Sequence, residues 1–340
     1  MKSARIAAVV IAVLFGGVLR ADVTVRYKNE LKVGAGAPPA VAQQTAGVMK
    51  STMPTETVIQ IKGTKGYTSN GKIISLTDFE KQVITVVDPE HKQFATVYMK
   101  DYADQVLSVL PAAAAPPSDA AQKLLNSMKT TFTSEKTGKT DTILGIQAEE
   151  TLLTLTVFMP LPSAASSTAP ARAPQPAELM KMDLHIWTAL PSEVERIPAL
   201  HEFSSVYGDG SAASVLNPDA LLGKAFGAMP GMGKGFTDML DELSQKKAIM
   251  LKTDIEMFMP FMAQMLQSSP AGANQAASFD PKAPVFEVNM DVQQISDASI
   301  DDSVFEVPED CHLTSLPDFF RAVLPTAPQP AAASAQQSSQ

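Results

Sequence analysis

The stretch TLLTLTVFMP (151–160) decides how this chain folds, because apolar side chains recur in it at every second position. The apolar residues at these alternating positions are Leu153, Leu155, Val157 and Met159. Successive side chains of a β-strand point to opposite faces of the sheet, so these residues are expected on one face. LKTDIEMFMP (251–260) repeats the design and also ends in Phe-Met-Pro. Proline cannot donate to the hydrogen-bond ladder, which predicts that both strands end there.

Each of these strands is followed by a return strand with the same alternation. ELMKMDLHIWT (178–188) follows the first and VFEVNMDVQQI (285–295) follows the second. In 178–188, 251–260 and 285–295, the apolar residues that alternate in the same way are Met180, Met182, Leu184, Ile186, Ile255, Met257, Met259, Phe286, Val288 and Met290. Such alternation predicts antiparallel strands with one apolar face, and we expect all fourteen residues to line an apolar ligand there. Trp187 has the opposite parity and should lie on the other face.

Shorter alternating runs precede these hairpins, and few segments have helical spacing. Strands are predicted in 23–27, 57–63 and 72–99, the last interrupted by turn chemistry at Asp88-Pro89-Glu90-His91. Amphipathic helices are predicted from Ser118 to Phe132, from a Ser192/Glu195 capping box whose first turn should kink or end at Pro198, and over 236–247. A large curved antiparallel sheet with two or three helices across its concave face makes an α+β domain.

The first 21 residues have the layout of a secretory signal peptide. Lys2 and Arg5 precede an apolar run over 6–15, and we place the cleavage after Ala21. A retained membrane anchor is the alternative, although the run is shorter than the roughly 20 residues that a span needs. We therefore expect a periplasmic or secreted protein. Its single cysteine, Cys311, cannot form an intrachain disulfide, so stability must come from the core.

Stretches rich in Ala, Pro and Ser interrupt the series of predicted strands. They are 34–47, 111–120, 160–177 and 267–284. Such segments cannot bury enough apolar surface to order themselves, so we interpret them as loop insertions within one domain. The expected organisation is a signal peptide over 1–21, one half-barrel domain over 22–323 and a disordered tail over 324–340.

Four segments carry a resemblance to a known fold. They are SLTDFEKQVITVVDPEHKQFATVYMKDY (75–102), TGKTDTILGIQAEETLLTLTV (137–157), MKMDLHIWTALPSEVERIPALHEF (180–203) and SIDDSVFEVPEDC (299–311). Their order resembles that of secreted bacterial proteins of unknown function allied to the lipoprotein-carrier (LolA/LolB-like) fold. That fold is an unclosed antiparallel half-barrel with helices across its concave face. The resemblance implies a terminal strand at Val304-Phe305-Glu306-Val307-Pro308, a tight hairpin entry at Gly145 that permits close backbone approach, and acyl-chain binding on the concave face.

No motif for catalysis or metal binding stands out. The four histidines are His91, His185, His201 and His312. None belongs to the HExxH pattern of zinc proteases, and Cys311 has no identifiable base. GAMPGMGKGF (227–236) fails the P-loop spacing, because Ala228 stands where a glycine is required and Gly235 replaces the hydroxyl. We therefore expect no enzymatic activity, no cofactor and no metal-ligating residues.

Methionine is the unusual feature of the composition: thirteen of the 17 methionines fall between Met128 and Met290. Flexible, polarizable thioethers suit an adaptable apolar pocket, and they also serve in plain core packing. A third interpretation is a Cu(I) site, since thioethers bind soft metal ions.

The leading hypothesis is a non-enzymatic carrier or envelope sensor that binds a lipid or another apolar ligand. The alternative is an envelope interaction or scaffold protein whose own side chains fill the interior, with an envelope protein as partner. Without the signal peptide the chain has 24 basic and 36 acidic side chains, a net charge of −12 against −9 for the whole chain. This balance excludes nucleic acid from the expected partners, and we expect a monomer.

Overall fold

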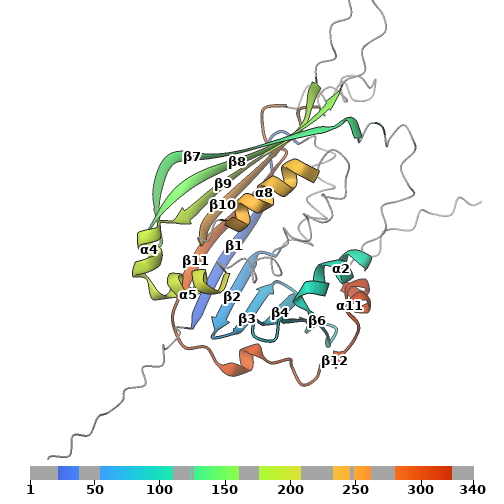
Figure 1. The fold of residues 1–340 in the computed structure, drawn as a ribbon, viewed down its shortest axis with the longest axis vertical. Coiled ribbons are helices and arrows are strands. Elements are labelled where there is room, and N and C mark those ends of the chain that lie inside the picture. The colour runs from blue at the N-terminus through green and yellow to red at the C-terminus, as the bar shows by residue number, and fades with distance from the viewer. Residues whose placement is uncertain are drawn as a thin grey trace, which may run out of the picture.

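The computed structural model describes residues 22–37, 54–109, 123, 126–160, 176–207, 233–245, 249–261 and 280–323. Their twelve strands form one sheet in the order β12-β6-β5-β4-β3-β2-β1-β11-β10-β9-β8-β7. Neighbouring strands are antiparallel except β12 and β6, which are parallel. The sheet does not close on itself, since β12 and β7 are its edges. The protein is thus α+β, with a large open sheet and few helices, as the sequence predicts (Figure 1).

The bounds of the elements are as follows. The strands are β1 (Val23–Val33), β2 (Glu56–Lys62), β3 (Lys65–Asn70), β4 (Ile73–Asp78), β5 (Val83–Asp88), β6 (Gln93–Tyr98), β7 (Lys129–Ile143), β8 (Ile146–Pro160), β9 (Pro176–Ala189), β10 (Met250–Phe258), β11 (Phe286–Ser296) and β12 (His312–Leu313). The helices are α2 (Met99–Val109), α4 (Pro191–Arg196), α5 (Pro198–Tyr207), α8 (Gly233–Gln245), α11 (Leu316–Val323) and the 3-10 helix η1 (Asp302–Phe305).

Strand β1 joins two meanders into one sheet. Strands β2 to β6 follow one another on one side of it, and β11 to β7 follow one another in reverse on the other. Val25 lies opposite Ile59 of β2 and opposite Ile295 of β11. Because both meanders share this strand, they form one continuous sheet rather than two separate sheets.

Two turns confirm predictions from sequence. Leu144 and Gly145 connect β7 to β8 with φ angles of +51° and +78°, as a two-residue hairpin requires. A Cβ on Gly145 would meet nothing within 4 Å, so the predicted reason, close backbone approach, is wrong and the dihedral angle is what favours glycine. At the β5–β6 turn, Asp88 Oδ1 accepts from the backbone N–H groups of Glu90 (2.9 Å) and His91 (3.1 Å).

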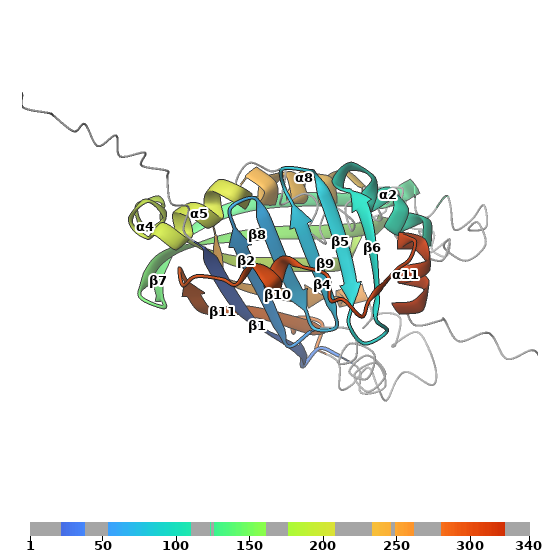
Figure 2. The ribbon, with the colours of Figure 1, turned by 90° about the horizontal axis from the view of Figure 1, so that it is seen from below.

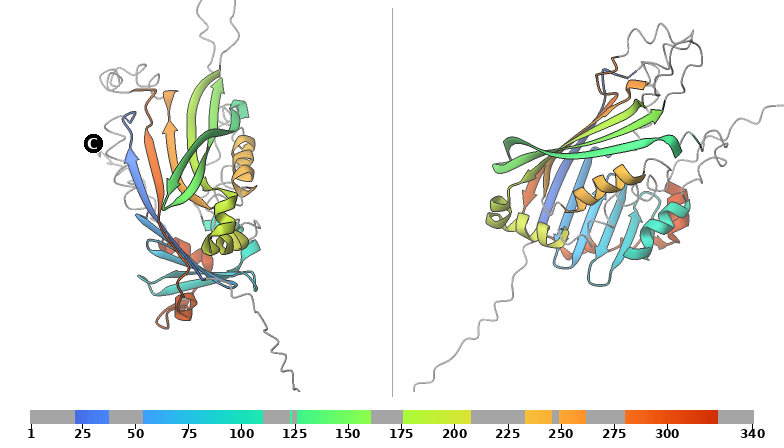
Figure 3. Two further views of the ribbon diagram at one scale, coloured as in Figure 1. Left: turned by 90° about the vertical axis from the view of Figure 1, so that its left-hand side faces the viewer. Right: turned by 45° about the horizontal axis from the view of Figure 1, so that its top comes forward.

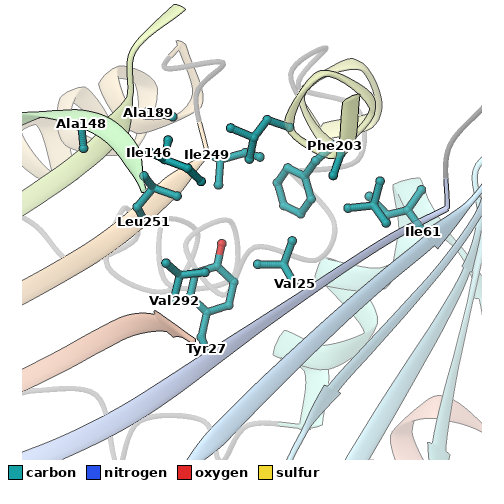
Figure 4. Packing of buried hydrophobic residues seen from close by; sticks show 13 residues of the cluster. Val25, Tyr27, Ile61, Ile146, Ala148, Ala189, Phe203, Ile249, Leu251 and Val292 are labelled. Atoms are coloured by element: carbon teal, nitrogen blue, oxygen red, sulfur yellow. The ribbon is translucent and has the colours of Figure 1, made fainter. Parts of the chain in front are cut away.

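The α-helices pack against one face of the sheet, here called the inner face (Figure 3). Three clusters of buried side chains lie between the two layers. In the first, Phe203 of α5 lies over Val25, Tyr27 and Ile61 (Figure 4). In the second, α2 and α11 cover the end of the sheet near β5 and β6. Phe319 of α11 is its largest side chain with no exposed surface.

The third cluster, the α8 cluster, is the one under α8. It consists of Leu153, Leu155, Leu184, Ile186 and Met239. Leu153 and Leu155 belong to the alternating stretch 151–160, so one face of that strand forms part of the core.

The C-terminal segment crosses the opposite, outer face of the sheet (Figure 2). The Ile300 N–H donates to Asp22 Oδ2 (2.7 Å), and Lys62 Nζ donates to the Ile300 carbonyl (2.6 Å). Lys62 also pairs with Asp302 (2.8 Å). The chain then pairs with β6 through β12, and α11 follows on the inner face against α2. The segment therefore wraps around the β6 edge.

The predicted terminal strand at Val304 to Pro308 is wrong. Residues Asp302–Phe305 form η1, in which the Asp301 side chain accepts from the Ser303 N–H (2.9 Å). Phe305 and Val307 instead lie beside Leu76 on the outer face. Strands β3, β4 and β5 beneath them already have two neighbours each, so no edge remains there for another strand to pair with.

The helix predictions need three corrections. Phe132 lies in β7 rather than at the end of a helix, because the strand begins at Lys129. Ser192 is not a cap: α4 begins at Pro191 after Leu190, without a side-chain cap bond, and ends before Pro198 as predicted. Helices α2 and α11 were missed. Helix α8 confirms the prediction over 236–247, although it begins at Gly233 and ends at Gln245.

Several predictions fall on other parts of the chain. The signal peptide (1–21), the tail (324–340) and most of the Ala/Pro/Ser-rich stretches lie outside the described residues. Among the helices that the structure does describe, none combines the length and the hydrophobicity of a membrane span.

Candidate functional site

Rows of side chains cross β8, β9, β10 and β11 on the inner face. The first is Thr151, Ile186, Thr253 and Met290; the second is Leu153, Leu184, Ile255 and Val288; the third is Leu155, Met182, Met257 and Phe286; the fourth is the pair Val157 and Met180. Twelve of the fourteen predicted lining residues fall in these rows. The register thus brings them together on one face, while their role in lining a ligand remains a prediction.

The other two predicted residues lie where the ladder becomes irregular. Met159 follows a register shift in the β8–β9 pairing and lies opposite Ala177. Met259 comes directly after Phe258, the last residue of β10. Both are half-buried. They mark the end of the inner face at which both Phe-Met-Pro stretches stop.

Helix α8 buries one part of this surface. Leu153, Leu155 and Ile186 are at most 1% exposed beneath it. The helix comes close because Gly235 faces the sheet: a Cβ there would lie 2.8 Å from the Thr130 side chain. The Gly235 N–H donates to Thr130 Oγ1 (3.2 Å). In the sequence, Gly235 stood out only as a position that fails the phosphate-loop pattern, so this contact was not predicted.

The rest of the surface is an apolar patch next to the α8 cluster. We define the apolar patch as Met180, Met182, Ile255, Met257, Phe286 and Val288, all of which are half-buried. Met182 and Ile255 also touch the α8 cluster. The inner face is therefore continuous from a fully buried core into a patch that retains accessible apolar surface.

Polar side chains border the patch toward β1. Thr253 is 6% exposed in the first row, and Met290 beside it lies opposite Asn29 of β1. The Asn29 amide donates to Thr57 Oγ1 (2.9 Å) and to the Pro54 carbonyl (3.1 Å). These bonds satisfy the buried amide. The polar side chains of Thr253 and Asn29 thus lie between the apolar patch and the cluster under α5.

The outer face carries a charged network around Glu150. Its carboxylate, 3% exposed, accepts from Thr137 Oγ1 (2.6 Å) and from His185 Nδ1 (2.9 Å), and it pairs with Lys139 Nζ (2.9 Å). Burial raises the pKa of Glu150, but the hydrogen bonds from Thr137, Lys139 and His185 outweigh burial and lower the pKa to about 2. Glu150 is therefore an ionised, fully paired group at neutral pH. It was not among the residues predicted from the sequence.

A shallow groove of about 250 Å³ lies beside this network. Glu150, His185, Trp187, Lys252 and Asn289 are among its lining residues. Trp187 and His185 thus lie on the face opposite Leu184 and Ile186, as their parity predicts. Most of the charges there are paired within the fold, for example Lys252 with Asp254 (2.9 Å).

The remaining candidates for chemistry are dispersed. His91 pairs with Asp88 (2.7 Å) in an exposed turn, while His201 and His312 are exposed. Within the described ranges, no three His, Cys, Asp or Glu side chains come together as a metal site. Burial raises the pKa of the Cys311 thiol, which lowers the fraction of reactive thiolate. Of the stretch 227–236, the structure describes only the first turn of α8.

Comparison with models of known protein families gives no match, and comparison with curated proteins gives none either. The fold and the inner-face geometry are therefore the basis for assigning a function.

Proposed function

We propose that this chain is a non-enzymatic exported protein that binds a lipid or another apolar ligand on the inner face of its sheet, as a carrier or envelope sensor. The observation that supports this most is the continuity of the apolar patch with the α8 cluster. An acyl chain that covers the patch would extend the packed core by one layer. Each buried methylene gains about 0.8 kcal/mol.

The composition of the patch suits ligands of variable shape. Three of its six residues are methionines, Met180, Met182 and Met257. Unbranched thioether side chains adopt many rotamers and so adapt to chains of different length and unsaturation. The neighbouring Phe286 and Val288 provide stiffer walls. This mixture favours a binder of a class of amphiphiles over a binder of one rigid molecule.

A neutral lipophilic dye such as Nile red tests the proposal on delipidated protein. Met257→Glu puts a carboxylate into the apolar patch and should weaken dye binding by about tenfold or more, equivalent to about 1.4 kcal/mol. Met257→Leu keeps the surface apolar and should bind like the parent. Met250→Glu is the matched control, because Met250 begins the same strand and is 37% exposed.

The dye result has a definite contrary outcome. If the parent protein gives no fluorescence gain, or if Met257→Glu binds as well as Met250→Glu, the inner face is not the binding surface. Circular dichroism of each variant separates loss of binding from loss of fold.

The second candidate function is an envelope scaffold with a filled interior. It is favoured by one observation: five of the predicted lining residues, Leu153, Leu155, Val157, Leu184 and Ile186, are already buried within the fold. In this case the dye finds no site. A defined envelope partner would then bind the parent and fail to bind chains that lack 160–177 or 267–284.

A further inference from the structure

Three methionines of two neighbouring strands lie close together on the inner face. Met182 of β9 lies directly opposite Met257 of β10, although 75 positions separate them. Met180 lies two residues from Met182 on the same face and opposite Val157 of β8. Directly opposite residues in an antiparallel pair have Cβ atoms about 4.5–5.5 Å apart, and diagonal neighbours about 7–8 Å apart. Long side chains at these positions are within reach of one another.

The side chains around these three methionines offer no carboxylate or imidazole ligand for hard cations or zinc. The four rows across β8 to β11 contain only Thr, Ile, Leu, Val, Met and Phe, without a carboxylate or an imidazole. Hard cations and zinc need oxygen, nitrogen or thiolate ligands, whereas neutral thioethers bind Cu(I) and its analogue Ag(I). All three methionines are half-buried, and their apolar surroundings would limit competition from water for an ion bound there.

We propose that Met180, Met182 and Met257 bind one soft monovalent cation, Cu(I) or Ag(I), through their three thioether sulfurs. Two rigid, hydrogen-bonded strands hold the ligands, so their positions are largely preset before the ion binds. Thioethers have no proton to lose, and binding should be nearly independent of pH between about 5 and 8. This site is a second activity of the inner face, independent of whether the patch also binds an amphiphile.

Silver titration of delipidated protein tests the site without redox chemistry. All titrations use a Cys311→Ser background, because the thiol is a stronger soft ligand than a thioether. With methionine labelled at its methyl carbon, NMR should show one Ag⁺ per chain and shifts confined to Met180, Met182 and Met257. Met182→Leu and Met257→Leu should each weaken Ag⁺ binding by about tenfold or more. Anaerobic Cu(I) should then show a sulfur-only shell by X-ray absorption.

Met290→Leu is the matched control, since Met290 is a half-buried methionine on the same face but lies opposite Thr253 and Asn29. It should titrate like the parent. Leucine is apolar and close to methionine in volume, so these variants should stay folded.

The proposal is overturned if Ag⁺ shifts Met239 and Met290 as much as Met182, or if Met182→Leu and Met257→Leu bind Ag⁺ like Met290→Leu. Dye binding distinguishes this failure from failure of the proposed function. A parent protein that binds the dye but shows no selective Ag⁺ shifts refutes only the cation site, and one that binds Ag⁺ at the three methionines but not the dye refutes only the apolar-ligand site.

Discussion

Replacing Glu150 with Gln should destabilise the folded protein at neutral pH and have little effect near pH 2. The carboxylate is 3% exposed and is bound by Thr137, Lys139 and His185. Glutamine has almost the same shape but carries no charge. The variant therefore isolates the contribution of the ionised group from that of packing.

The pKa of Glu150 gives the size of the effect. Burial alone would raise it, but the hydrogen bonds lower it from 4.5 to about 2. A pKa lowered by that amount corresponds to about 3 kcal/mol of folding free energy. Because the pKa is lower in the folded state, this stabilisation is fully present above the unfolded-state pKa and is lost as the pH falls toward the folded-state pKa.

Urea unfolding followed by the fluorescence of Trp187 measures the effect. Trp187 is the single tryptophan and lies directly opposite Glu150 in the β8–β9 register. Glu150→Gln should lower the free energy of unfolding by about 3 kcal/mol at pH 7, and the difference should shrink below about pH 4.5. Glu149→Gln is the control, because Glu149 pairs with the exposed Lys136 (2.8 Å) and such pairs contribute at most about 1 kcal/mol.

Two results would refute this reasoning. Equal destabilisation by Glu150→Gln and Glu149→Gln at pH 7 would show that the buried network adds nothing beyond a surface pair. A loss for Glu150→Gln that persists unchanged to pH 2 would show that shape, not charge, is responsible.

Three further substitutions test how the helices attach to the sheet. Gly235→Ala adds a methyl group 2.8 Å from the Thr130 side chain, and the clash should outweigh the gain in helix propensity by about 1–2 kcal/mol in urea unfolding; unchanged stability would mean that α8 does not approach so closely. Ser315→Ala removes the cap in which Ser315 Oγ accepts from the Asp318 N–H (3.2 Å), at about 1 kcal/mol, measured by hydrogen exchange in α11. Phe319→Ala should cost about 3–5 kcal/mol in urea unfolding, since Phe319 has no exposed surface, and a loss below 1 kcal/mol would contradict its place in the core.

The alternation of apolar residues was enough to predict the sheet and the parity of its strands. It could not predict which residues lie opposite one another, because register depends on irregularities such as the shift between Val157 and Phe158. That is why Met182 and Met257 appeared as members of separate strands rather than as a pair.

The capping signals show how local patterns compete. Ser192 and Glu195 match a capping box, but Leu190 takes the cap position two residues earlier and Pro191 begins the helix, where its fixed φ is favourable. The cap that forms is at Ser315, whose hydroxyl accepts from the Asp318 N–H (3.2 Å) and donates to Asp318 Oδ2 (2.6 Å). This signal was present in the sequence and was overlooked.

Glu150 could not have been recognised from its own strand. It has the outward parity of its strand, where an acidic residue is ordinarily solvated. Its burial and its low pKa come from Thr137 and Lys139, beside a register shift in β7, and from His185 of β9. Such contacts depend on how neighbouring strands pair at an irregular edge, so the sequence of one strand does not predict them.

Binding of an apolar ligand by the inner face is tested most directly by lipid mass spectrometry of the full-length chain, purified without detergent after expression from its own N-terminus. The parent and Met250→Glu should each carry a co-purified amphiphile, and Met257→Glu should carry much less. A parent protein free of amphiphile, or equal amounts in the parent and Met257→Glu, would contradict the assignment.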